Sequence, residues 1–285
     1  MRRPGIDLHT HSTASDGRLS PAALVAAAAE AGVTLLALTD HDTTAGVAEA
    51  ADAAGKHGIR LLPAAEISVT WQRRTLHVVG LGVDPNAPAL ADGLAGLQAR
   101  RRERTETIGA KLSRLGVADA AARARALAGD GQVTRSHFAR LLVEDGRCRD
   151  VKQAFKRYLK PGKPGHARVA WAGLDEAIGW IHAAGGVAVL AHPLAYGMTG
   201  AWRRRMLTAF TGAGGDALEI GCGNSTLQGV TLAADDARRH GLHGSVGSDF
   251  HGPEQHWLKL GRPLPLPADV PAVWEHPRFR GELAL

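Results

Sequence analysis

The chain of 285 residues has little cysteine, few aromatic residues and no long apolar run. Its two cysteines, Cys148 and Cys222, are too few for a disulfide framework or a thiolate metal site, so we expect both to be reduced and semi-buried. No apolar run is long enough to span a bilayer, and the first five residues lack the apolar core of a signal peptide. These absences predict a cytoplasmic protein that does not enter a membrane.

What is present is ordinary for a globular protein, with 45% hydrophobic and 22% charged residues. The length suits one large domain, or one domain with an insertion. The formal net charge is +6, and arginines cluster in Ala-rich stretches such as residues 98–104. Such clusters are either solvated helix faces or a basic surface that attracts a polyanion such as a nucleotide or RNA, and charge alone does not decide between them.

The first eighty residues alternate strand-like and helical segments. Ser20 is the expected N-cap of a helix that has Pro21 at its first position and ends at Gly32, and Gly58 closes the next helix. The continuous apolar run at residues 33–39 is typical of a strand that is buried on both faces of a parallel sheet. The predicted strands are 6–11, 33–39, 59–69 and 76–83, and the predicted helices are 22–31 and 44–57.

The pattern changes to helical from about residue 87 to residue 160. Residues 105–116 form a clear amphipathic helix with apolar Ile108, Leu112 and Leu115, and Thr134 is the expected N-cap of another helix. Residues 151–159 predict a third helix, and a Pro/Gly-rich loop follows. We therefore expect residues 87–165 to be an inserted helical subdomain, with residues 1–86 and 166–285 forming the main domain.

Alternation resumes after that loop, with helices at 174–184, 201–211 and 227–240 and strands at 187–191, 217–220 and 243–247. The tail after Pro263 is proline-rich and irregular, and we expect it to pack across the end of the main domain. Seven strands that alternate with helices indicate an α/β fold, and they favour a (β/α) barrel over a doubly wound sheet.

Histidines and carboxylates stand at or near the ends of these predicted strands. His9 and His11 are two residues apart, so in an extended segment their side chains point to one face, and Asp249 and His251 have the same spacing. Active sites of barrels are assembled at the carboxyl ends of the strands. The candidate metal ligands are His9, His11, Asp16, His41, Glu66, His77, His192, Asp249 and His251.

This set offers only nitrogen and oxygen ligands, which suit Zn, Mn or Fe. Nine ligands are too many for one ion, so two or three divalent ions are expected, with Glu66 as a plausible bridge. Sites of this kind act on phosphate esters, because the ions activate water, orient the phosphoryl group and stabilise the leaving oxygen. Taken singly, each acid could be a helix cap or a surface residue and His77 a core histidine, but their joint position favours the metal site.

Several motifs together resemble the PHP (polymerase and histidinol phosphatase) family. They are Asp7-Leu8-His9-Thr10-His11-Ser12, Ser15-Asp16-Gly17, Thr39-Asp40-His41-Asp42, Glu66, Ala191-His192-Pro193 and Gly247-Ser248-Asp249-Phe250-His251. The resemblance implies a distorted, TIM-like (β/α)7 barrel with a trinuclear metal centre. Asp40 and Asp42 flank His41 on the opposite side of the chain, and we expect them to lie outside the metal centre.

The resemblance also implies a division of the ligands. One ion would take His9, His11, Glu66 and Asp249, a second Glu66, His77 and His192, and a third Asp16, His41 and His251. Within this set we expect Glu66, His192, Asp249 and His251 to carry the catalysis. No motif ligand is replaced in this chain, which argues against a copy that has lost its activity.

The helical insertion resembles one branch of the family, which hydrolyses nucleoside 3′,5′-bisphosphates and trims short 5′-phosphorylated RNA. The similar stretches are residues 133–140, residues 154–159 and Gly162-Lys163-Pro164-Gly165. In that branch the insertion caps the barrel mouth, which makes Arg135, His137 and Lys163 the candidates for holding substrate phosphate. His166 stands where an aromatic residue such as tyrosine is expected, which puts a base-stacking role at this position in doubt.

The leading hypothesis is a metal-dependent phosphoesterase whose partner is a nucleotide or a short RNA substrate, with no stable protein partner. A histidinol-phosphate phosphatase would share the metal site but not obviously this insertion. A protein of a different class, a binding module that is stabilised by metals and lacks catalysis, is the third alternative. These alternatives predict different behaviour when a ligand such as His192 is removed.

Overall fold

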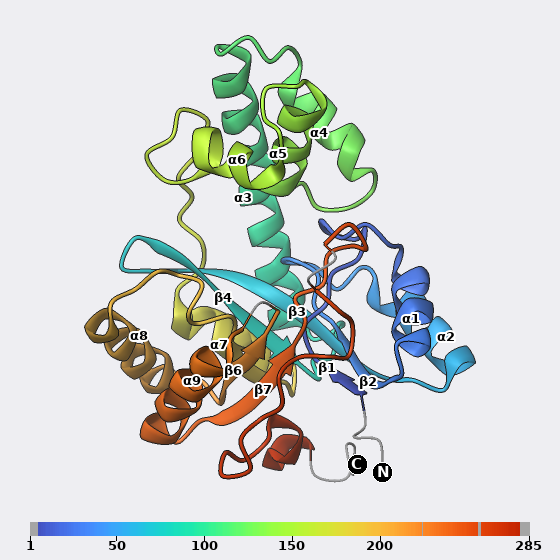
Figure 1. Cartoon of the computed structure of the whole chain (residues 1–285), viewed down its shortest axis with the longest axis vertical. Helices are drawn as coiled ribbons and strands as arrows, with labels where there is room; N and C mark the ends of the chain where they lie inside the picture. The colour runs from blue at the N-terminus through green and yellow to red at the C-terminus, as the bar shows by residue number, and fades with distance from the viewer. Residues whose placement is uncertain (1–4, 224, 256–257, 280–285) are drawn as a thin grey trace.

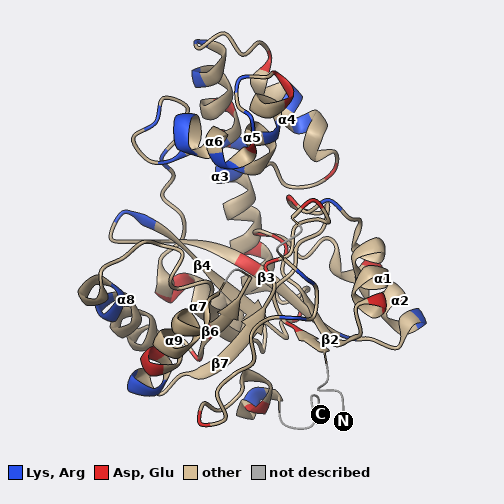
Figure 2. Ribbon diagram, in the orientation of Figure 1, with Lys and Arg blue, Asp and Glu red and all other residues tan. Residues whose placement is uncertain are grey.

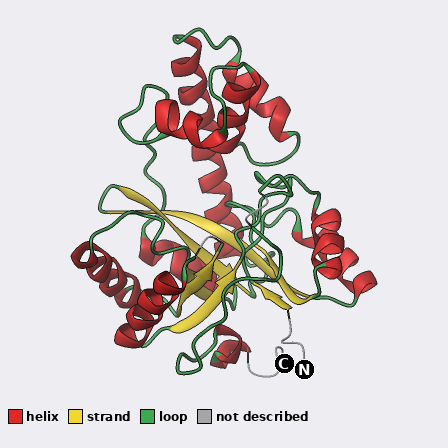
Figure 3. Cartoon of the chain, viewed as in Figure 1, coloured by secondary structure: helices red, strands yellow, loops and turns green. Residues whose placement is uncertain are grey.

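The computed structural model describes residues 5–223, 225–255 and 258–279, in which seven strands form one sheet in the order β1 to β7 (Figures 1 and 3). The strands are β1 (Gly5–Asp7), β2 (Val33–Leu38), β3 (Arg60–Trp71), β4 (Arg74–Leu81), β5 (Val187–Leu190), β6 (Ala217–Cys222) and β7 (His243–Gly247). The backbone N–H of Leu8 donates to the carbonyl of Val246 at 3.0 Å, and a bridge between Thr10 and Phe250 joins the same two ends. The sheet is therefore an almost closed barrel.

One strand of the barrel, β4, is antiparallel to both of its neighbours. β1, β2 and β3 pair in parallel, as do β5, β6 and β7, but β4 is antiparallel to both β3 and β5. β3 and β4 are joined by a tight hairpin in which Gln72 and Arg73 both have positive φ, 47° and 64°. Two residues with positive φ make the turn whose twist matches that of an antiparallel pair. No helix crosses over between these strands, which distorts the barrel from regular (β/α) alternation.

Helices cover the outside of the barrel where local signals place them. They are α1 (Pro21–Glu30), α2 (Val47–His57), α7 (Leu174–Ala183), α8 (Gly200–Gly212) and α9 (Leu227–His240). The Ser20 side chain caps α1 by accepting from the N–H of Ala23, and Gly58 ends α2 with a left-handed φ of 66°. Both caps were predicted from the sequence. In the described part of the chain, no helix is both long and apolar enough to cross a membrane.

The C-terminal tail closes the barrel at the end where the strands begin. It contains two short 3₁₀ helices, η2 (Val273–Glu275) and η3 (Pro277–Phe279), and Val273 and Phe279 are buried in the barrel interior. The N–H of Gly244 in β7 donates to the carbonyl of Pro271 at 2.8 Å. The expectation that the proline-rich tail packs across the barrel is confirmed.

The insertion stands above the other end of the barrel and has a hydrophobic core of its own (Figure 1). Its elements are α3 (Pro88–Ser113), α4 (Ala120–Ala128), α5 (Arg135–Glu144), α6 (Val151–Ala154) and the π-helical turn η1 (Phe155–Leu159). Many of its surface positions are Lys or Arg (Figure 2). Thr134 caps α5 as predicted, by accepting from the N–H of Ser136.

α3 belongs to two cores at once. In its first half Leu90, Leu94 and Leu97 are buried against the barrel, where Gly93 lies directly against Trp180. In its second half Ile108 and Leu112 are buried in the core of the insertion. The helix predicted at 105–116 is thus the end of a helix of 26 residues that starts at Pro88. The domain boundary at residue 87 stays a prediction, because α3 runs through both parts.

Candidate metal centre

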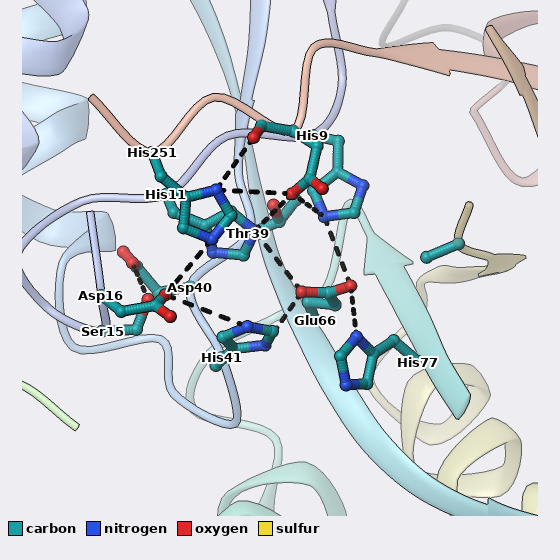
Figure 4. Close-up of polar contacts among 12 residues, drawn as sticks. His9, His11, Ser15, Asp16, Thr39, Asp40, His41, Glu66, His77 and His251 are labelled. Atoms are coloured by element: carbon teal, nitrogen blue, oxygen red, sulfur yellow. Dashed lines mark hydrogen bonds and ion pairs between the residues drawn. The ribbon is translucent and has the colours of Figure 1, made fainter. Parts of the chain in front are cut away.

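The nine candidate ligands come together at the end of the barrel that faces the insertion (Figure 4). His9 and His11 follow β1, and their ring centroids lie 5.2 Å apart. His41 follows β2 and pairs with Glu66 in an isolated β-bridge, while Glu66 and His77 lie within β3 and β4. His192, Asp249 and His251 come from the segments after β5 and β7.

Glu66 is the centre of this cluster. Its Oε1 lies 2.9 Å from His77 Nδ1 and 2.9 Å from His192 Nε2, and its Oε2 lies 2.9 Å from His41 Nδ1. Its carboxylate is also 3.4 Å from the Nε2 atoms of His9 and His11. Burial raises the pKa of Glu66, but the imidazoles around it outweigh burial and hold that pKa well below its usual range. A carboxylate that faces five imidazoles is suited to bridging two ions.

The remaining carboxylates, Asp249 and Asp16, each lie close to two of the imidazoles. Asp249 Oδ1 is 3.3 Å from His11 Nε2 and 3.5 Å from His9 Nε2. Asp16 Oδ1 is 3.4 Å from His251 Nε2 and 3.9 Å from His41 Nε2. Burial lowers the pKa of His11 to about 3, so this side chain is held as a neutral imidazole, the form that binds metal.

Three overlapping groups of these residues have ligand atoms within 4.8 Å of one another. They are His9, His11 and Glu66; His41, Glu66 and His77; and His11, Asp16, His41 and His251. Glu66 takes part in two groups, and Asp16, His41 and His251 share one, as the family resemblance implies. His11 and His41 each connect two groups, which the division into three separate ions does not include.

Buried atoms without hydrogen-bond partners show that the cluster fits metal ions. They are Nε2 of His9, both ring nitrogens of His11, Oδ1 of Asp16, Nδ1 of His41 and Nδ1 of His192. Buried polar atoms are nearly always partnered in native proteins. His41 Nδ1 is 2.9 Å from Glu66 Oε2 without the geometry of a hydrogen bond. These side chains point at shared positions between them, which is the arrangement that a metal centre needs.

Strained backbone holds two of the ligands in place. His192 has φ 30° and Asp249 has φ 53°, in the left-handed region that residues other than glycine rarely adopt. Such conformations persist only where the surrounding structure enforces them, and they concentrate at functional sites. Each lies two residues after a strand end, His192 after β5 and Asp249 after β7, at the point where the chain turns away from the barrel.

A buried carboxylate that sequence reasoning missed orients two of the ligands. Glu219 Oε1 lies 3.0 Å from His9 Nδ1, and Glu219 Oε2 accepts from the backbone N–H of His192 at 2.6 Å. A carboxylate on the far nitrogen of a metal-binding imidazole fixes its tautomer and orientation. The signal in the sequence is an acid inside the apolar strand β6, where an unpaired charge would be costly.

The insertion contacts the metal centre through its helix α5. The hydroxyl of Thr134 donates to Asp16 Oδ2 at 2.8 Å, and the guanidinium of Arg140 donates to the carbonyl of Asp16. Asp40 and Asp42 lie outside the cluster, as expected. Asp40 accepts from Ser12 and Ser15, and Asp42 pairs with buried Arg101 at 2.6 Å.

A basic hollow lies between the cluster and the insertion. Its lining includes Arg104 and Arg135, whose guanidinium groups lie 5.0 Å above the Trp171 ring and 5.6 Å above the Phe155 ring. In the described ranges neither guanidinium makes an ion pair. Burial and neighbouring arginines lower the pKa of both side chains more than the nearby carboxylate of Asp16 raises it. Arg104 was not predicted, because its place depends on the packing of α3.

The three residues predicted to hold phosphate lie in different surroundings. Arg135 lines the basic hollow. His137 is buried, and its Nδ1 accepts from the backbone N–H of Thr134, so it serves as a helix cap and does not line the hollow. Lys163 is exposed on the loop after η1, and its role stays a prediction. His166 turns its Nδ1 toward the carbonyl of Leu159 at 3.3 Å.

A second hollow of about 470 Å³ opens on the opposite side of the cluster. His192, Glu219 and Asp249 form its polar wall. The rest is mostly apolar and includes Leu194, Ile220, Ala233 and Leu258. The metal centre is thus flanked by one basic and one largely apolar hollow.

Comparisons with known proteins agree with this geometry. A family model described as the PHP domain matches residues 7–182. A protein from Chromobacterium violaceum named 3′,5′-nucleoside bisphosphate phosphatase is 44% identical over 270 residues, covering 94% of this chain and 95% of that protein. A protein from Haemophilus influenzae named 5′-3′ exoribonuclease is 48% identical over 270 residues, covering 94% of this chain and 97% of that protein.

Solved structures show the same fold. An amidohydrolase from Chromobacterium violaceum, solved with bound sulfate, superimposes with a TM-score of 0.91 at 44% identity, covering 95% of this chain and 94% of that chain. A structure from Bifidobacterium adolescentis, described as a candidate metal-dependent phosphoesterase, has a TM-score of 0.78 at 27% identity. It covers 95% of this chain and 93% of that one.

Proposed function

Because the chain belongs to the PHP family of phosphoester hydrolases, we propose that it acts on nucleoside 3′,5′-bisphosphates and short 5′-phosphorylated RNA. The observation that carries this proposal is the convergence of nine candidate nitrogen and oxygen ligands, with Glu66 at their centre, beside a hollow lined by Arg104 and Arg135. Relatives named as a nucleoside bisphosphate phosphatase and as exoribonucleases match nearly the whole chain.

The cluster would hold two or three divalent ions of Mn, Fe or Zn, because its ligand set contains no thiolate. When bound, such ions supply Lewis acidity, which activates water and neutralises charge on a phosphoryl group. We assign His9, His11, Glu66 and Asp249 to one ion, Glu66, His77 and His192 to a second, and Asp16, His41 and His251 to a third. Of these, we assign the catalysis to Glu66, His192, Asp249 and His251.

The arginines of the basic hollow would orient the substrate. Arg104 and Arg135 are half-buried cations without an ion pair in the described residues, so a phosphate dianion would give both charges a partner as it binds. Guanidinium groups hold phosphate through pairs of N–H donors. The apolar hollow across the cluster would take the nucleoside part, which places the scissile bond between the two hollows.

The same charges argue against a histidinol-phosphate substrate. Its amine is a cation, and Arg101, Arg104 and Arg135 line the hollow that faces the cluster. Like charges in a desolvated site repel each other strongly. A nucleotide with a second phosphate complements this hollow, whereas histidinol phosphate would place a positive charge beside it.

The proposal is tested by loading the protein with Mn²⁺ and measuring phosphate release from adenosine 3′,5′-bisphosphate, from short 5′-phosphorylated RNA and from histidinol phosphate. We expect turnover of the first two substrates. R104Q and R135Q are each expected to raise KM about tenfold or more, because each variant removes a charge-assisted contact with the substrate phosphate. R114Q, at the exposed C-cap of α3, is the matched control. A metal-loaded protein that releases nothing from the nucleotides refutes the proposal.

The variant H192A separates catalysis from a purely structural role of the metals. A catalytic centre predicts lost turnover with a nearly unchanged melting curve. A metal-stabilised binding module predicts that the melting transition itself is lost or strongly lowered.

A further inference from the structure

A patch of tryptophan and arginine side chains lies on the outer surface of the barrel, away from the metal ligands. It is formed by Trp71, Arg73 and Arg74 at the β3–β4 hairpin and by Trp202, Arg204 and Arg205 at the start of α8, and we call it the Trp–Arg patch. The two indole rings meet edge to face with centroids 5.7 Å apart. The guanidinium carbons of Arg74 and Arg205 lie 5.6 Å and 4.9 Å from the Trp202 centroid.

The patch is positive and has no acidic neighbours in its own segments. Residues 67–83 and 193–215 contain neither Asp nor Glu. Arg73, Arg74, Arg204 and Arg205 are exposed, and within the described ranges none of them makes an ion pair. Figure 2 shows basic residues on both the hairpin and α8. A guanidinium that stacks on an indole still offers its N–H donors to solvent, so these charges are available to an anion.

A shallow hollow lies beside the rings. It is lined by Trp71 and Gln72 of the hairpin and by Ala201, Arg204, Arg205, Thr208 and Ala209 of α8. Aromatic faces with arginines around them are how proteins hold single-stranded nucleic acid, since bases stack on the rings and the cations follow the backbone. Neither side chain of the Trp71–Trp202 pair is needed by the metal centre.

The β4 strand connects the patch to the site of hydrolysis. Arg74 is the first residue of β4, Thr75 lines the basic hollow, and His77 is a candidate metal ligand. Three residues of strand span about 10 Å, and stacked nucleotides advance about 3.4 Å each along one strand. On the α8 side, the Tyr196 ring lies 5.3 Å from the His192 ring, six residues before Trp202. The patch is therefore a few nucleotides from the cluster by either route.

We propose that the Trp–Arg patch binds the 3′ part of a single-stranded RNA substrate while its 5′-terminal nucleotide occupies the metal centre. The inference rests on the proposed function and deepens it, because a mononucleotide is too short to reach the patch. The positive charge and the stacking surface favour RNA over an acidic protein segment, which offers charge but no bases.

Kinetics with substrates of different length test the proposal. For a ten-nucleotide 5′-phosphorylated RNA, R74Q/R205Q and W202L are each expected to raise KM about 5- to 100-fold. This is the loss of affinity expected when one base no longer stacks on an aromatic ring. Turnover of adenosine 3′,5′-bisphosphate is expected to stay unchanged. The salt dependence of RNA binding is expected to become shallower by about 1.4 in log–log slope for the double variant, since single strands lose about 0.7 per phosphate contact.

K56Q/R239Q is the matched control, because it removes two exposed positive charges far from the patch. Equal losses on the mononucleotide and on the ten-nucleotide RNA, or no loss on either, would overturn the proposal. If W202L does not fold, the double arginine variant still decides. Anisotropy of a labelled oligouridylate on the metal-free protein tests docking even if no nucleotide is hydrolysed. Competition by polyglutamate as strong as that by oligouridylate would assign the patch to an acidic protein instead.

Discussion

Replacing Glu219 with glutamine is expected to weaken metal binding without unfolding the barrel. The carboxylate faces two donors at once, His9 Nδ1 at 3.0 Å and the backbone N–H of His192 at 2.6 Å. An amide of the same shape has one acceptor oxygen, so its NH₂ group must face one of these donors. If the NH₂ faces His9, it favours the tautomer with the proton on Nε2, the atom that points toward Glu66 and Asp249.

The magnitude follows from this geometry. A buried donor without a partner costs about 1–3 kcal/mol, and loss of a partner on a metal-binding histidine weakens metal affinity about 10- to 100-fold. Glu219 supports ligands from two of the assigned ion sites, so we expect the larger end of that range. The assay is a metal titration by calorimetry, or by competition with a fluorescent chelator, on metal-stripped E219Q and wild-type protein.

A near copy of this arrangement at the other end of the barrel provides the control. Asp216, just before β6, accepts from His182 Nε2 at 2.8 Å and from the N–H of Ala188 at 2.8 Å. D216N removes a similar carboxylate from a similar pair of donors, far from the candidate ligands. The reasoning is refuted if E219Q binds metal as tightly as the wild type, or if D216N weakens metal binding as much as E219Q does.

Three further outcomes follow from the cluster and its surroundings. Stripping the metals with a chelator is expected to lower the melting temperature by about 5 °C for each ion removed, since each ion at a hundred times its Kd adds about 2.7 kcal/mol to stability; calorimetry of both forms checks this, and an unchanged transition contradicts it. T134V removes the hydroxyl that donates to Asp16 and is expected to lower the number of bound ions measured by elemental analysis, whereas T134S keeps that number. G247A places a Cβ 2.3 Å from the Cβ of His9 and is expected to abolish activity, whereas G55A on exposed α2, with no atom within 4 Å of its Cβ, leaves activity intact.

The parts of the fold that depend on local signals were predicted well. α9 and β7 have the predicted bounds, and α1 begins at Pro21 because Ser20 caps it. The antiparallel direction of β4 was not predicted, although the short polar turn around Gln72 and Arg73 leaves no room for the crossover that a parallel pair needs. The full length of α3 was also missed, since glycines and a run of arginines interrupt its apolar pattern.

The residues of the candidate site also fall into those that local sequence signals predict and those that only the packing of distant segments reveals. The gathering of the site's nine candidate ligands could be predicted because each stands in a recognisable motif or near the end of a strand segment. Glu219 and Arg104 were not predicted, because their roles depend on which segments pack beside them: β6 against the end of β1, and α3 against Trp171. The prediction that His137 holds phosphate did not foresee that its Nδ1 caps α5, and its role toward substrate stays a prediction.

The continuity of α3 limits how this molecule could be rebuilt from parts. A helix of 26 residues extends about 39 Å, and its buried leucines serve the barrel first and the insertion afterwards. Excising residues 87–165 as a cassette would strip Leu90, Leu94 and Leu97 from the barrel and expose the apolar surface that they cover. A chimera that exchanges the cap with a relative would have to join the two chains inside the helix, between Leu97 and Ile108, and keep the helical phase. An exchange of the helical insertion therefore has to keep the first half of α3, because that half packs against the barrel.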